Sequence, residues 1–179
     1  TTILPENFKF KPVKLVVNSN VDSIYVLDAG VFDGLMEFTM EGEFRGFIGA
    51  PKVTPNPVDL FWKQFSTEEQ RARQSLFIPI KYSNLDLGLD SFLYVVESGE
   101  AKSDSIKKLN PAGEDILIKD GFFPPRGDLI NTSIFVDIMV HDYGIYSVLD
   151  KSKGRIFTYN QRGQLLYTFG NSGSQKGTF

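Results

Sequence analysis

The chain has 179 residues, of which 41% are hydrophobic and 23% charged, and these ordinary proportions exclude a disordered chain. Its 19 Lys and Arg against 22 Asp and Glu give a formal charge of −3, which excludes a basic surface for general nucleic-acid binding. The absence of cysteine excludes disulfides, thiolate catalysis and cysteine-ligated zinc, and no apolar run is long enough to span a membrane.

The first part of the chain reads as four short strands followed by an interruption. Strands are predicted near residues 13–17, 23–28, 34–39 and 43–48, because β-rich runs alternate there with turn-forming residues. Three prolines follow, Pro57 can begin a short helix, and Ser66 with Glu69 has the spacing of a capping box. We therefore expect a short helical insertion at about residues 50–76.

The rest of the chain repeats this plan twice. Strands are expected near residues 83–89, 92–97, 104–109 and 114–118, and the segment at about 119–133, with a double proline and two glycines, is expected to be loop. The clearest unit follows, with the runs FVDIMV, IYSVL, RIFTY and LLYTF separated by turn clusters. The chain thus contains three four-stranded units, at about residues 10–49, 77–121 and 134–170.

Two markers show that these units are copies of one repeat. A tyrosine of the second strand precedes a glycine of the last hairpin by 17, 19 and 17 residues, in the pairs Tyr25 and Gly42, Tyr94 and Gly113, and Tyr146 and Gly163. A carboxylate ends each second strand, at Asp28, Glu97 and Asp150. One such sheet cannot bury two faces alone, so the repeats are expected to stack on one another.

The repeated pattern (I/L)-Y-V-x-D, followed by R-I-x-x-Y-x-x-x-G-x-L-x-x-x-F-G, resembles the NHL repeat, a four-stranded antiparallel blade of a β-propeller. The resemblance implies an all-β fold, with residues 1–179 forming one partial propeller domain that is six-bladed when complete. Inserts at these places resemble those of a bacterial group, which implies an extracellular or cell-surface location. Since three blades cannot close a ring, we expect either a longer propeller or two copies completing one, with self-association through open blade edges.

Both insertions are expected on one face of a propeller, together with the turns after the second strands. Aromatic side chains beside prolines and an arginine suit the recognition of a protein, peptide or carbohydrate. The candidate ligand-binding residues on this insertion face are Phe61, Trp62, Phe122, Phe123 and Arg126. An equally good interpretation is that these aromatic side chains only anchor the insertions to the sheets.

The first strands align as KLVVN, DLGLD and DIMVH, which places Lys14, Asp86 and Asp137 in register. First strands line the central channel of a propeller, so these three residues are channel candidates for binding a small molecule or metal. A hydrated channel with local ion pairs is the favoured interpretation. No catalytic residue and no metal ligand is predicted, and His141, the only histidine, excludes a two-histidine site within this chain.

The carboxylates Asp28, Glu97 and Asp150 could form a calcium ring, because hard cations need several converging oxygens. Their repetition in every unit favours instead a role in fixing the following turn. We therefore expect a non-enzymatic binding or scaffolding propeller without a cofactor. The alternative is a metal-dependent, lactonase-like hydrolase with calcium in the channel, since some six-bladed propellers of this type are such enzymes.

Overall fold

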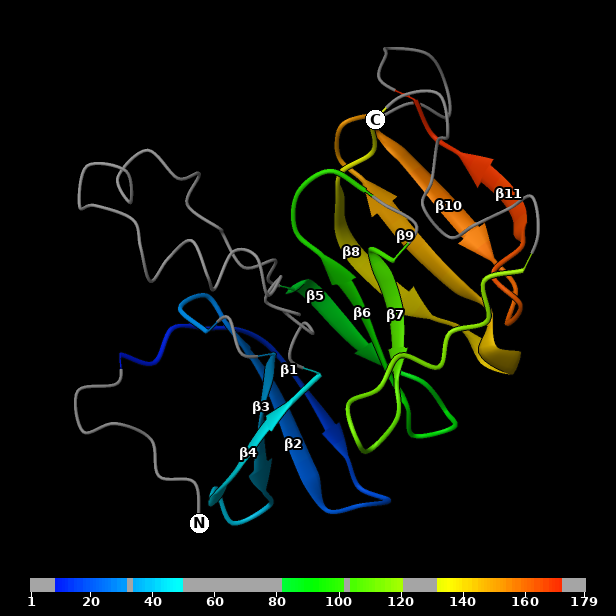
Figure 1. Cartoon of the computed structure of the whole chain (residues 1–179). Coiled ribbons are helices and arrows are strands. Elements are labelled where there is room, and N and C mark those ends of the chain that lie inside the picture. The colour runs from blue at the N-terminus through cyan, green and yellow to red at the C-terminus, as the bar shows by residue number, and fades with distance from the viewer. Residues whose placement is uncertain (1–8, 32–33, 50–81, 102–103, 121–131, 172–179) are drawn as a thin grey trace, which may run out of the picture.

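Three stacked antiparallel sheets make up the structure, a computed structural model that describes residues 9–31, 34–49, 82–101, 104–120 and 132–171 (Figure 1). Within these ranges the chain is all-β apart from one 3-10 turn, η1 (Asp142–Gly144). No helix in the described part is long and apolar enough to cross a membrane. The helical insertion expected at 50–76 and most of the loop expected at 119–133 lie outside the described residues.

Each repeat forms one sheet, here called a blade. Blade 1 has the order β1 (Pro12–Asn18), β2 (Ser23–Asp28), β3 (Leu35–Thr39) and β4 (Phe44–Ile48). Blade 2 has the order β5 (Tyr82–Leu87), β6 (Leu93–Glu97) and β7 (Ile106–Leu109). Blade 3 has the order β8 (Phe135–Val140), β9 (Tyr146–Asp150), β10 (Arg155–Tyr159) and β11 (Leu165–Phe169). The all-β fold with antiparallel blades is thereby confirmed.

The fourth strand expected in blade 2 at 114–118 is replaced by an isolated bridge between Leu109 and Asp115. The Asp115 carboxylate accepts the backbone amides of Lys108, at 3.1 Å, and of Leu117, at 3.0 Å. A side-chain oxygen thus stands where a backbone carbonyl of the outer strand would continue the ladder. The prediction of a regular strand was wrong here because the Asp115 carboxylate takes the Lys108 amide that a ladder would otherwise pair.

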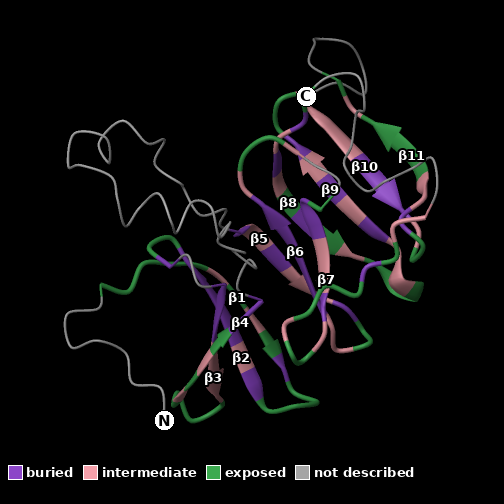
Figure 2. Ribbon diagram, in the orientation of Figure 1, coloured by how far each residue is buried: buried purple, intermediate pink, exposed green. Residues whose placement is uncertain are grey.

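The blades stack with their first strands side by side, since β1 contacts β5 and β5 contacts β8 (Figure 1). Alternate apolar side chains from the facing sheets form the core between them (Figure 2). One cluster joins blade 1 to blade 2 and consists of Tyr25, Leu27, Leu35, Ile48, Tyr82, Leu85, Leu93, Val95 and Leu109. A second joins blade 2 to blade 3 and consists of Tyr94, Val96, Ile106, Leu117, Phe135, Ile138, Tyr146, Val148, Phe157 and Tyr159.

Candidate functional site

A β-bulge near the beginning of each first strand sets which side chains share a level on the inner wall. The register shifts between Pro12 and Lys14 in β1, between Tyr82 and Asn84 in β5, and between Phe135 and Asp137 in β8. After the bulge, three residues occupy equivalent positions: Lys14 lies opposite Leu27, Asn84 opposite Val96 and Asp137 opposite Leu149. Pairing with the second strand therefore places Asn84, and not Asp86, level with Lys14 and Asp137.

Asp86 lies two residues farther along β5, opposite Tyr94, on the same side of the strand as Asn84. The predicted alignment was wrong for blade 2 because DLGLD begins two residues beyond the position on β5 that is equivalent to Lys14 and Asp137. The β5–β6 hairpin already closes where the Gly88 amide donates to the Phe92 carbonyl at 2.9 Å. Asp90, aligned by sequence with Asn18 and His141, consequently lies in the turn.

Asp90 pairs there with Lys108, whose Nζ lies 2.5 Å from Oδ2 of the carboxylate. The same ammonium group lies 4.9 Å from the ring centroid of Phe92 and 5.3 Å from that of Tyr94. Burial acts to lower the pKa of Lys108, but the hydrogen bonds to Asp90 and to Tyr94 outweigh it and raise the pKa. This group stabilises the β5–β6 turn against β7 and is separate from the inner wall.

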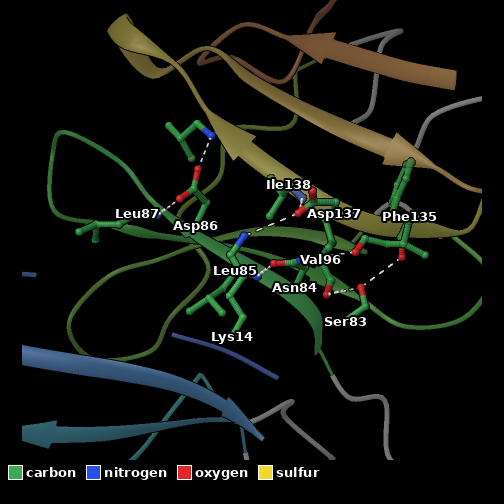
Figure 3. A network of polar contacts seen from close by, with 12 residues as sticks. Lys14, Ser83, Asn84, Leu85, Asp86, Leu87, Val96, Phe135, Asp137 and Ile138 are labelled. Atoms are coloured by element: carbon green, nitrogen blue, oxygen red, sulfur yellow. Dashed lines mark hydrogen bonds and ion pairs between the residues drawn. The ribbon is translucent and has the colours of Figure 1, made fainter. Parts of the chain in front are cut away.

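Lys14 and Asp137 meet across the inner wall, with Lys14 Nζ 3.7 Å from Asp137 Oδ1 (Figure 3). The contact joins blade 1 to blade 3. Both side chains remain partly exposed, at 34% and 51%, so water screens the pair and it contributes at most about 1 kcal/mol to stability. The structure therefore brings together two of the three predicted channel residues in a weak surface ion pair.

Asp86 and Asp137 both use their carboxylates to accept backbone amides. Asp86 Oδ2 accepts the amide of Val140 on β8 at 2.7 Å, and its Oδ1 accepts the amide of Leu87 at 2.9 Å. Asp137 Oδ1 accepts the amide of Ile138 at 2.9 Å. Each of these three oxygens accepts one amide, so both carboxylates have a structural role in the first strands.

Two polar residues of β5 that the sequence did not single out extend this network. Ser83 Oγ lies 3.1 Å from the Phe135 carbonyl, to which it donates, and Asn84 Nδ2 donates to the Val136 carbonyl at 3.3 Å (Figure 3). Both acceptors lie at the bulge of β8, where the register shifts between Phe135 and Asp137. The only sequence signal was a Ser-Asn pair where β1 has Val13 and Lys14, which is too little to predict a link between blades.

The carboxylates that end β2 and β9 fix turns, as the repeat pattern predicted. Asp28 Oδ1 accepts the Gly30 amide at 2.7 Å, and its Oδ2 accepts the amide of Lys11 just before β1. Asp150 Oδ1 accepts the Ser152 amide at 2.9 Å and the amide of Ile134, just before β8, at 3.1 Å. Each buried carboxylate thus holds both the following turn and the entry to the first strand of its own blade.

Glu97 departs from this pattern because its longer side chain pairs with the ammonium group of Lys107 on β7. Both side chains are largely buried, so the pair is shielded from water far better than Lys14 and Asp137. Across the described ranges, no group of three or more His, Asp or Glu side chains is placed to hold a metal ion. The three repeated carboxylates are therefore separate structural devices of their blades.

His141 lies at the end of β8, with Nε2 2.8 Å from Ser147 Oγ, and Ser147 Oγ lies 2.7 Å from Thr158 Oγ1. A serine beside a histidine is the beginning of a nucleophile and base pair, but such a pair also needs a group that orients the imidazole. The described residues supply no hydrogen bond to the other ring nitrogen of His141. The insertion-face candidates Phe61, Trp62, Phe122, Phe123 and Arg126 lie outside the described residues.

No protein-family model and no curated protein matches this chain. A protein of unknown function from Bacteroides caccae matches its structure with a TM-score of 0.51 and 16% identity, over 97% of this chain and 50% of that one. A catalytically inactive virginiamycin B lyase from Staphylococcus aureus, solved with quinupristin, matches with a TM-score of 0.54 and 11% identity, over 92% of this chain and 43% of that one. The chain thus spans about half the length of these two structures, and the likeness shows a propeller-like fold alone.

Proposed function

We propose that this chain is a non-enzymatic binding or scaffolding module built of NHL-type blades. The observation that carries the proposal is that the inner-wall carboxylates Asp86 and Asp137 bind backbone amides, at 2.7 to 2.9 Å. A hydrolase of the lactonase type would need several such oxygens to converge on calcium. Here Asp86 connects β5 to β8 and Asp137 binds the next amide of its own strand, which favours a structural inner wall and a binding surface elsewhere on the chain.

The insertion face is the surface proposed to bind the ligand. In an antiparallel sheet of order β1-β2-β3-β4, strands β2 and β4 run in the same direction and end at the same edge. Gly49, where the long connection after β4 begins, therefore lies at the same edge of the blade as the turn that Asp28 holds. At blade 3, the chain returns beside the corresponding turn, since Ser152 Oγ donates to the Thr132 carbonyl at 3.0 Å. Long connections gathered at one edge are the usual place of recognition in scaffolds of this kind.

The proposed ligand is a protein, peptide or carbohydrate, because adjacent aromatics with an arginine offer both a flat apolar surface and a planar hydrogen-bond donor. Phe122, Phe123 and Arg126 are the residues assigned to it. A bacterial cell surface is the proposed location, on the strength of the resemblance to NHL-type propellers with inserts. Binding without chemistry requires no cofactor, which distinguishes this proposal from the calcium-dependent alternative.

The test compares the full chain with a triple variant, Phe122→Ala, Phe123→Ala and Arg126→Ala, on arrays of polysaccharides and peptides with and without EDTA. Tyr143→Ala is the matched control, because this aromatic side chain is exposed in the turn at the opposite edge of blade 3. Binding that survives EDTA, persists in the control and disappears in the triple variant is expected. Turnover of phenyl acetate or simple lactones that EDTA stops and Asp86→Asn abolishes would overturn the proposal in favour of the hydrolase.

A further inference from the structure

We infer that two copies of this chain associate head to tail, with blade 1 of each copy packing against blade 3 of the other, so that their six blades close one ring. The inference rests on the three blades of the fold and is independent of the ligand proposed above. It assigns a partner to two apolar sheet faces that no other described strand covers. It also completes the inner wall, since Lys14 and Asp137 of each copy would then line one closed channel.

Blade 1 exposes side chains that are buried at the same positions of the other blades. Leu15 of β1 lies opposite Val26, as Leu85 lies opposite Val95 in blade 2 and Ile138 opposite Val148 in blade 3. Leu85 and Ile138 are 0% and 2% exposed because the preceding blade covers them, whereas Leu15 is 57% exposed. Leu15 therefore lies on a blade-packing face that nothing in the described chain covers.

An aromatic cluster extends this open face across blade 1. Ring contacts run from Phe10 to Phe38, from Phe38 to Phe44 and from Phe44 to Phe47, with centroid distances of 6.3, 5.4 and 5.2 Å. The two ends of the cluster, Phe10 and Phe47, remain exposed on the surface, and β1 adds the exposed side chains of Val13 and Val17. A continuous apolar face of this kind is typical of a surface that packs against another sheet.

Blade 3 exposes the complementary face. In blade 1, Ile48 lies opposite Leu35, and both are buried against blade 2; the equivalent pair in blade 3 is Phe169 opposite Ile156. Phe169 is 50% exposed, and β11 is the most exposed strand of this blade (Figure 2). Blade 3 thus presents outward the same face with which blade 1 already packs on blade 2.

The glycine turns of the outer hairpins give independent evidence of what covers blade 1. A Cβ added at Gly113 would lie 2.5 Å from the backbone nitrogen of Gly49, which follows the last strand of the preceding blade. A Cβ added at Gly163 would similarly lie 2.4 Å from the carbonyl oxygen of Ile118. The equivalent turn of blade 1, at Gly42, has no heavy atom of the described residues within 4 Å of such a Cβ. The Gly42 turn is therefore shaped to receive the end of a preceding outer strand.

Gly170 follows β11 as Gly49 follows β4, so the outer strand of blade 3 has the end that the Gly42 turn would receive. Within one chain these two ends belong to opposite open faces. In the pair of copies, Gly170 of each copy lies against Gly42 of the other. Both new contacts between copies then repeat the contact that blade 1 makes with blade 2 within one chain. A head-to-tail contact that closes after two copies leaves no open blade and no route to a filament.

The ring that results has the size expected of this architecture. Three blades from each copy make six, within the four to eight that propellers use. Both similar solved structures continue for about as much chain again beyond the part that they share with this one, since this chain covers 50% and 43% of them. A second copy supplies the same amount of chain in a symmetric form.

The first test is the native mass of the full chain by analytical ultracentrifugation at micromolar concentration. The expected result is twice the 20.1 kDa of one chain, falling to one chain in Leu15→Asp. Leu89→Asp is the matched control and should remain dimeric, because this leucine is 81% exposed in a turn away from both faces. A monomeric wild type would overturn the inference and assign the open faces to sheets from other polypeptide, and an open-ended series of oligomers would overturn it as well.

The second test remains valid if Leu15→Asp fails to fold, and it uses the absence of native cysteine. Glu41→Cys and Asn171→Cys place single thiols beside Gly42 and Gly170, both on exposed positions. Oxidation of the two variants mixed in equal amounts should give a disulfide between one chain of each kind. Neither variant alone should crosslink. Crosslinking of either variant with itself, or none in the mixture, would contradict head-to-tail packing.

Discussion

Asp86 on β5 accepts the backbone amide of Val140 on β8 at a distance of 2.7 Å, so a side chain of blade 2 holds the first strand of blade 3. Neighbouring blades are separate sheets and share no backbone ladder. A carboxylate that reaches across therefore supplies a hydrogen bond that the fold does not provide by itself. Its Oδ1 also accepts the Leu87 amide at 2.9 Å, which fixes the orientation of the carboxylate.

Asp86→Ala is expected to lower the free energy of unfolding by about 1–3 kcal/mol, because the Val140 amide loses a charged acceptor at the joint between two blades. Urea denaturation followed by circular dichroism measures the loss. Asp137→Ala is the control and should cost no more than about 1 kcal/mol, because its ion pair with Lys14 is partly exposed. Equal losses in the two variants would contradict the assignment of Asp86 as the joint.

Asp150→Ala should be among the most destabilising changes in blade 3, with a loss of about 2–4 kcal/mol. Its Oδ1 accepts three hydrogen bonds, from the amide and the hydroxyl of Ser152 and from the amide of Ile134. Asp150→Asn should lower the melting temperature less, because an amide oxygen still accepts, and neither variant should alter a response to calcium. Asp142→Ala is the control, because Asp142 is exposed. If calcium stabilised the wild type but not Asp150→Asn, the structural role of the Asp150 carboxylate would be refuted.

Tyr146→Phe is expected to leave stability unchanged or to raise it by up to about 1.5 kcal/mol. The Tyr146 hydroxyl is buried without a hydrogen-bond partner in the described chain, while its ring packs on Tyr159 and Tyr94 with centroid distances of 5.4 and 5.5 Å. Phenylalanine keeps those ring contacts. Tyr82→Phe is the opposite case and should cost about 1–2 kcal/mol, because its hydroxyl donates to the Gly49 carbonyl. Thermal unfolding of both variants gives the comparison.

The fold is expected to lose stability in alkali. Burial raises the pKa of the tyrosine hydroxyls of Tyr25, Tyr82, Tyr94 and Tyr146 above the usual 10.0. The unfolded chain therefore releases these protons at a lower pH than the folded chain, so the free energy of unfolding falls as pH rises above about 10. The raised pKa of Lys108 acts in the same direction, since its folded form also retains a proton longer.

For each fully buried tyrosine the expected slope is about 1.4 kcal/mol per pH unit between its unfolded and folded pKa. Urea unfolding at pH values from about 8.5 to about 11.5, which bracket the ordinary tyrosine pKa, measures the slope. Tyr146→Phe should reduce it by the contribution of one tyrosine. A slope that is the same in this variant would show that the hydroxyl of Tyr146 titrates freely in the folded chain.

Local patterns in the sequence were sufficient for the architecture. Alternating apolar residues with turn clusters predicted every described strand of blades 1 and 3 to within about two residues, since side-chain periodicity and turn chemistry are set by neighbours along the chain. The carboxylates Asp28 and Asp150 were assigned correctly to their turns for the same reason, because each binds an amide two residues away. The insertion-face residues and the proposed ligand classes remain predictions.

Only the tertiary structure decided which residues meet. The pairing of β5 with β6 placed Asn84, and not Asp86, level with Lys14 and Asp137, and the Asp115 carboxylate took the place of a backbone acceptor in the outer strand of blade 2. The packing of blades buried Leu85 while the equivalent Leu15 stayed open. The physical reason is common to all of these: a strand pattern reports which face a residue occupies, whereas bulges, side-chain acceptors and blade contacts depend on partners distant in sequence.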